Sequence, residues 1–160
     1  MSNEKLLRIY LNDHLAGSLA GIELAKRARS SNEGTPLGDY LAGFIAELEE
    51  DRTDLVKIID ALGFPQDRLK LGGAWLAEKV GRLKLNGQLT GYSDLSRLVE
   101  LEGLCLGVEG KASLWRSLKS VAGTDTRLAV TDLDRLLKRA ERQREELEIH
   151  RLEAARRALA

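Results

Sequence analysis

The sequence predicts an all-α fold, a bundle of four long helices with one shorter crossing helix between the second and third long helices. Apolar residues recur every three or four positions along most of the chain, which is the spacing of one face of an α-helix. Aromatic residues make up only 4% of the sequence, and β-branched runs, which favour strands, are missing. We therefore expect one domain, residues 1–160, with helices at 4–30, 36–62, 66–85, 94–122 and 131–159.

Local signals mark where several of these helices begin. Thr35 followed by Pro36 predicts the second start, because threonine caps the first amides and proline lacks the amide that would otherwise be unpaired. Ser93 or Asp94 is expected to cap the helix at 94–122. A segment that begins at Thr131 resembles a capping box and predicts the start of the last helix.

Two patterns predict which helices touch. Gly17 and Gly21 lie one turn apart in the first helix, and we expect them to allow close approach of another helix. Acidic residues outnumber basic ones in residues 36–62, whereas basic residues outnumber acidic ones in 66–91. These two segments are therefore predicted to lie against each other.

The composition argues against several classes of protein. Lys plus Arg and Asp plus Glu each number 25, so no global field would draw the chain to nucleic acid or to an anionic membrane. No apolar run reaches the length of a membrane span. The chain has one cysteine, Cys105, and its first residues lack the apolar stretch of a signal peptide. We expect a cytoplasmic protein with Cys105 as a buried, unreactive side chain.

Motifs for nucleotide binding and hydrolysis are also missing. The sequence has no Gly-x4-Gly-Lys-Ser/Thr, no Gly-x-Gly-x-x-Gly after a strand, no Cys-x-x-Cys and no Gly-x-Ser-x-Gly. Any chemistry must therefore come from side chains inside the bundle.

Polar residues interrupt the apolar stripes at comparable depths in the four long helices. Because burying an unpaired charge is expensive, such residues must form hydrogen bonds, pair with each other or bind an ion. We predict that they form a buried polar layer, with these candidate members: His14, Asp51, Arg52, Glu102, Glu109, Gln143 and His150.

A complete di-metal centre is not expected in this layer. Such a centre in a helical bundle takes one Glu from each of two helices and a Glu-x-x-His from each of the other two. The residue three positions before His14 is Leu11, and the one before His150 is Leu147, so neither histidine motif is complete. Arg52, in the second helix, would also oppose a bound cation.

A non-standard site for iron, manganese or zinc stays open as an alternative. Glu146 and His150 lie four apart on one helical face. The structural interpretation, which we favour, is a salt link or core hydrogen bond for this pair and a buried ion pair for Asp51 with Arg52. The candidate metal set is His14, Glu102, Glu146 and His150.

Three stretches, residues 10–17, 48–52 and 101–103, resemble a group of uncharacterised bacterial proteins with ferritin-like bundles. The resemblance implies a four-helix bundle of ferritin-like type and carries over no catalytic residue. Where ferritins and rubrerythrins keep carboxylates and histidines, this chain departs from their pattern, which argues against oxidase and iron-storage activity.

These observations predict a non-enzymatic scaffold or interaction protein, with a homodimer or a protein partner. The alternative is a metal-binding protein or metal-dependent oxidoreductase with the non-standard site. A third hypothesis is a bundle that binds an apolar ligand bordered by the glycine-rich first helix, Trp75 and Trp115.

Overall fold

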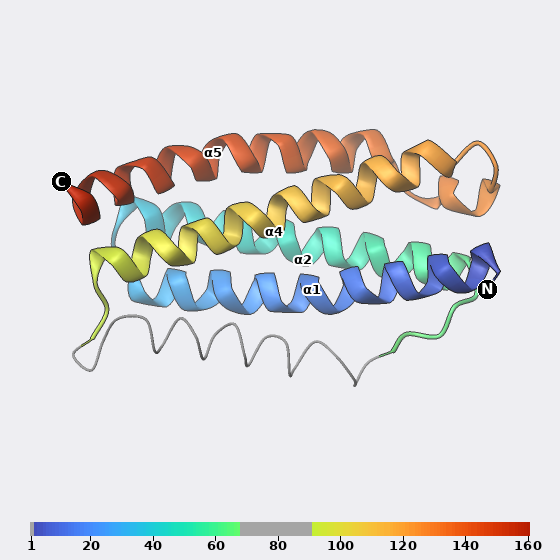
Figure 1. Cartoon of the computed structure of the whole chain (residues 1–160), viewed down its shortest axis with the longest axis horizontal. Coiled ribbons are helices and arrows are strands. Elements are labelled where there is room, and N and C mark those ends of the chain that lie inside the picture. Colours follow the sequence, from blue (N-terminus) through green and yellow to red (C-terminus); the bar gives the residue numbers. More distant parts are fainter. Residues whose placement is uncertain (1, 68–90) are drawn as a thin grey trace.

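The computed structural model describes residues 2–67 and 91–160, and this part of the chain is helical and contains no strand. The α-helices are α1 (Asn3–Ser31), α2 (Pro36–Ala61), α4 (Asp94–Val121) and α5 (Leu133–Leu159), and a short 3-10 helix, η1 (Thr126–Val130), lies between α4 and α5 (Figure 1). The predicted all-helical fold with four long helices is confirmed. The expected crossing helix at 66–85 lies outside the described residues, apart from residues 66 and 67. Its predicted docking on residues 36–62 lies outside them as well.

Two of the predicted helix starts are confirmed in detail. The Thr35 hydroxyl accepts a hydrogen bond from the Gly38 amide at 3.2 Å, with Pro36 as the first helical residue. Ser93 accepts from the Ser96 amide at 3.1 Å, and the Ser96 hydroxyl accepts from the Ser93 amide at 3.3 Å. The second pair is a reciprocal capping box, which satisfies two amides at the start of α4.

The predicted start of the last helix is wrong by one or two residues. Asp132, not Thr131, is the cap of α5, and its carboxylate accepts from the Arg135 amide at 2.9 Å. A carboxylate also interacts favourably with the positive end of the helix dipole, which a threonine hydroxyl does not.

The helix directions follow from the contacts between helices. Tyr10 bonds to Ser117 at one end of the α1–α4 interface, and Arg27 pairs with Glu100 at the other, so α1 and α4 are antiparallel. α1 and α2 form one antiparallel hairpin, and α4 and α5 form another (Figure 1). As a result α2 and α4 run in the same direction, and α2 ends at the opposite end of the bundle from the start of α4.

α1 and α4 are in close contact at Gly103. A Cβ atom at this position would lie 3.0 Å from a methyl group of Leu24. The expected close contact at Gly17 and Gly21 is not found among the described residues, because no other atom lies within 4 Å of a Cβ built on either glycine. The buried stripe of α1 instead runs through residues such as Leu11 and Ala25.

The sides of the bundle are packed unequally. The two hairpins pack along their lengths, and α1 packs on α4, whereas the backbones of α2 and α5 approach each other at few points. None of the helices in residues 2–67 and 91–160 is long and apolar enough to cross a membrane.

Two glycines in α2 should respond oppositely to substitution by alanine. A Cβ on Gly38 would lie 2.3 Å from the backbone oxygen of Asn32, so Gly38→Ala should destabilise the fold by about 1–3 kcal/mol through overpacking. A Cβ on Gly43 would have no neighbour within 4 Å among residues 2–67 and 91–160, so Gly43→Ala should raise stability by roughly 0.5–1 kcal/mol through helix propensity. Urea unfolding of the two variants measures both changes in the free energy of unfolding. Equal changes would contradict the tight turn between α1 and α2.

Candidate functional site

A set of polar side chains from α2, α4 and α5 meets inside the bundle. We call it the central network. Asp51 is only 2% exposed and Gln143 is fully buried. The members are Glu47 and Asp51 on α2, Lys111 on α4, and Arg139 and Gln143 on α5.

Lys111 is the centre of this network. Its Nζ donates to Oδ2 of Asp51 at 2.6 Å and also to Oε1 of Gln143. Gln143 in turn donates from Nε2 to Oε2 of Glu47 at 2.8 Å. The side-chain amide of Gln143 therefore bridges the Lys111 ammonium and the Glu47 carboxylate. Its oxygen accepts one hydrogen bond and its nitrogen donates another.

Arg139 closes the other side of Asp51. Its Nη1 donates to Oδ1 of Asp51 at 3.1 Å, and its Nη2 lies 2.9 Å from Oε2 of Glu50. Both oxygens of the Asp51 carboxylate are thus bound to a cation. Burial lowers the pKa of the Lys111 amine, while the neighbouring Asp51 carboxylate acts in the opposite direction.

Further ion pairs continue the network toward the surface. Arg142 donates to Glu47 and, at 3.0 Å, to Glu146. Arg135 lies 2.8 Å from Asp54. Burial would raise the pKa of Asp54, but hydrogen bonds from Arg135 and from a lysine on α2 hold that pKa below its usual value.

Two of the predicted polar-layer residues, Asp51 and Gln143, belong to the central network. Lys111 was not anticipated, although it interrupts the apolar stripe of α4 between Val108 and Trp115. Its place in that stripe is the sequence signal for Lys111, but such a signal does not by itself distinguish a buried amine from one that extends to solvent.

Three other candidates lie outside the central network. The side chain of Glu102 is 50% exposed and lies 3.7 Å from Arg151, and that of Glu109 is 44% exposed and pairs with Arg116 at 3.0 Å. Arg52 is half-buried, and its Nε has no hydrogen-bond partner among the described residues. Glu102 and Glu109 therefore lie at the surface of the bundle, not in its interior.

Each histidine packs against a tyrosine on the side of the bundle. The ring of His14 contacts Tyr10 edge to face at 4.7 Å, and the ring of His150 lies 4.5 Å from Tyr40. Burial lowers the pKa of both imidazoles, with an opposing effect from a nearby carboxylate in each case.

The structure does not bring the four candidate metal ligands together. The contacts of α1 and α5 with α4 place His14 level with about residue 113 and His150 level with about residue 103, a separation of roughly 15 Å along the bundle. Glu146 is bound to Arg142, and Glu102 lies near Arg151. Across residues 2–67 and 91–160, no group of three or more His, Cys, Asp or Glu side chains could hold a metal ion.

A second buried set, the terminal network, lies where α1 ends and α4 begins. Glu100 is 1% exposed, with Nε of Arg27 at 3.2 Å from one carboxylate oxygen and the Tyr92 hydroxyl at 3.0 Å from the other. Asn32 donates to the Tyr92 hydroxyl at 2.8 Å and accepts from Nε of Arg97 at 2.7 Å. This set ties the turn after α1 to the first turns of α4.

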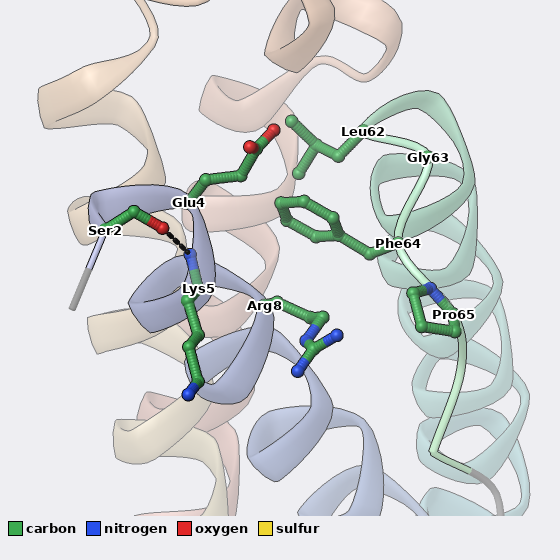
Figure 2. Close-up of a pocket in the computed structure, with 8 residues that line it drawn as sticks. All are labelled: Ser2, Glu4, Lys5, Arg8, Leu62, Gly63, Phe64 and Pro65. Atoms are coloured by element: carbon green, nitrogen blue, oxygen red, sulfur yellow. Dashed lines mark hydrogen bonds between the residues drawn. The ribbon is translucent and has the colours of Figure 1, made fainter.

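Figure 2 shows a surface hollow of about 410 Å³ between the first turns of α1 and the turn after α2. Apolar side chains and charges of both signs border it, and the residues that line it include no buried polar side chain. The lining residues are Ser2, Glu4, Lys5, Arg8, Leu62, Gly63, Phe64 and Pro65. Nothing in this hollow converges on one ligand chemistry.

The comparisons with known proteins give no family. No family model, curated protein or solved structure matches the chain. A function must therefore be inferred from the chemistry of the two buried networks. Of the residues in the apolar-ligand hypothesis, Trp115 is packed in the hydrophobic core at 1% exposure, and Trp75 lies outside the described residues.

Removal of the Lys111 ammonium should cost more than removal of an exposed one from the same helix. Lys111→Met leaves Oε1 of Gln143 without its donor and Asp51 with one cation instead of two, so we expect a loss of about 3 kcal/mol. Lys119→Met, which breaks an exposed pair with Asp134, should leave the urea midpoint close to that of the wild type. Similar midpoints for the two variants would contradict a central role for Lys111.

The pH dependence of stability should reveal the buried carboxyl of Glu100. Burial raises the pKa of Glu100 above its usual value of 4.5. The folded state therefore still holds a proton at pH values where the unfolded state has released it. As a result, the free energy of unfolding falls as the pH rises from the usual pKa to the raised one. Glu100→Gln should therefore gain stability relative to the wild type between pH 4 and pH 7.

Glu109→Gln is the matched control for this experiment. A hydrogen bond from Arg116 lowers the pKa of Glu109, so the ionised Glu109 stabilises the fold. The stability of Glu109→Gln relative to the wild type should therefore fall as the pH rises through the acidic range. Urea unfolding at several pH values measures both trends. A Glu100→Gln difference that is constant with pH would show that Glu100 ionises normally.

Proposed function

We propose that this chain is a ferritin-like bundle whose interior is closed by ion pairs in place of a metal centre, and that it acts as a non-enzymatic scaffold or interaction protein. The observation that carries the proposal is the position of the Lys111 ammonium between Asp51 and Gln143. A positive charge fixed to the chain lies beside the two buried carboxylates of α2, Asp51 and Glu47, that could otherwise have contributed to a metal site.

The direction of the helices supports the ferritin-like part of this proposal. α1 and α2 form one hairpin, α4 and α5 form the other, and α2 runs parallel to α4 (Figure 1). One long connection between two antiparallel hairpins is the arrangement of ferritin-like bundles.

The residues of the central network do not fit a di-iron centre. That centre needs four carboxylates and two histidines that point inward. The central network offers the carboxylates of Glu47 and Asp51, and both are already bound by the donors of Lys111, Arg139 and Gln143. A divalent cation placed here would meet two fixed positive charges in a poorly solvated interior, which is strongly unfavourable.

Exposed apolar side chains on α4 and α5 support a role in protein contact. Leu106, Ile149 and Leu159 are each more than two thirds exposed. Balanced charge over the whole chain favours recognition by such local features rather than by a long-range field. A second copy of the chain or another protein would be the partner.

Metal content by plasma mass spectrometry tests the proposal. Untagged wild-type protein should hold no stoichiometric iron, manganese or zinc, either as purified or after each metal is added in turn. Analytical ultracentrifugation of the same samples would determine whether the chain forms a homodimer.

Two variants make the metal result specific. If one or two ions bind per chain and Asp51→Asn removes them, the central network is a metal site and the proposal fails. If His150→Ala removes them instead, the non-standard set around His150 is the site, and the proposal fails in favour of a metal-dependent function.

A further inference from the structure

The two hairpins of the bundle are joined by two different kinds of interface. On one side α1 and α4 pack closely, with a leucine methyl against Gly103. On the other side the backbones of α2 and α5 approach at few points, and long polar side chains bridge the two helices beside the apolar core that both share. We call this second interface the α2–α5 seam.

Ion pairs of one orientation bridge the α2–α5 seam. In each pair the carboxylate comes from α2 and the guanidinium comes from α5. The Asp54–Arg135 pair measures 2.8 Å and the Asp51–Arg139 pair 3.1 Å, and Arg142 pairs with Glu47 nearer the middle of the bundle. This segregation of charge makes the seam attractive only while the α2 carboxylates are ionised.

The two ends of the seam differ. At one end η1 packs on α2, with Leu128 fully buried and Nη1 of Arg127 donating to the backbone oxygen of Leu62 at 3.3 Å. At the other end a hollow of about 150 Å³ lies among the start of α2, the last turns of α5 and the first turn of α4, which contributes Arg97. Its lining includes Thr35, Pro36, Leu37, His150, Ala154 and Arg157.

We propose that the bundle opens along the α2–α5 seam, from this hollow toward η1, with the α1–α4 contact as the hinge and the ion pairs as the latch. The inference goes beyond the proposed function and does not depend on it. Apolar packing at the hinge is insensitive to charge, whereas the latch consists of pairs that a change of charge can break.

Acid is the condition that should release the latch. Protonation of the α2 carboxylates would leave the guanidinium groups of α5 and the Lys111 ammonium without counter-charges, and they would repel one another across the seam. Protonation of His150 would add to this positive charge. The charged and titratable groups that face the seam or the hollow at its end are Tyr40, Glu47, Glu50, Asp51, Asp54 and Lys57 on α2, Arg97 and Lys111 on α4, Arg127 on η1, and Arg135, Arg139, Arg142, Glu146, His150, Glu153 and Arg157 on α5.

Distances between spin labels can follow the opening directly. Ala46→Cys with Glu145→Cys reports the α2–α5 seam, and Leu106→Cys with Glu145→Cys reports the α4–α5 hairpin through the same α5 label. These positions are exposed, and both pairs would be placed in a Cys105→Ala background. Distances would be measured from pH 7 down to pH 2, because hydrogen bonds from Arg135 and Lys57 lower the pKa of Asp54 and keep that carboxylate ionised at pH 4, and at pH 7 with Arg139→Gln.

We expect a longer distance population for the seam pair at the acidic end of this range and in Arg139→Gln, longer by about one helix diameter, roughly 10 Å. The hairpin pair should keep its distance, and the far-UV circular dichroism should keep its helical signal. If the seam distance stays the same in acid and in the variant, the latch does not exist. If both distances change with loss of helix, the bundle unfolds as one unit and separate opening is excluded.

Arg142→Gln provides a second route if Arg139→Gln fails to fold. Arg142 is partly exposed, and its loss removes a seam pair while both cations on Asp51 remain. The pH titration of the labelled Cys105→Ala protein requires neither arginine substitution. The metal measurements above are independent of the opening, so each proposal can fail alone.

Discussion

The ion pair between Lys111 and Asp51 is the constraint on which the arrangement of three helices depends. A buried ammonium costs several kcal/mol unless an anion and further acceptors compensate it. Here the anion comes from α2 and the neutral acceptor, Gln143, comes from α5. A shift of either helix by one residue would turn these partners away by about 100°. The pair therefore specifies the register of α2 and α5 against α4 more strictly than apolar packing alone.

The distribution of charge between α2 and α5 explains why these helices are neighbours. The buried carboxylates of α2 are stable only beside positive charges. In the central network α4 contributes Lys111, whereas α5 contributes Arg135, Arg139 and Arg142 along one face to the acids of α2. Apolar residues then cover the remaining faces of α2 against α1. The excess of acids in residues 36–62 thus has a partner within the described chain, on α5.

Sequence patterns predicted the helices well and the buried polar groups only in part. The starts at Pro36 and Asp94 carry local signals in Thr35 and Ser93, and Asp51 and Gln143 interrupt clean apolar stripes. In α4, however, the pattern predicts Glu102 in the polar layer, whereas Glu100 is the buried carboxyl. These positions lie about 200° apart on a helix. A helix that is apolar on nearly every side gives no single stripe from which to choose between them.

Lys111 was missed for a related reason. A lysine near an apolar stripe usually extends its amine to solvent, so its position alone does not indicate burial. Only the three-dimensional meeting of α2, α4 and α5 supplies acceptors for the amine in the interior. On the proposed interpretation, the cation of this layer is a side chain and cannot exchange with solvent as a metal ion can. The layer then needs no metal for its stability, and its response to the surroundings is limited to the ionisation of its own carboxylates.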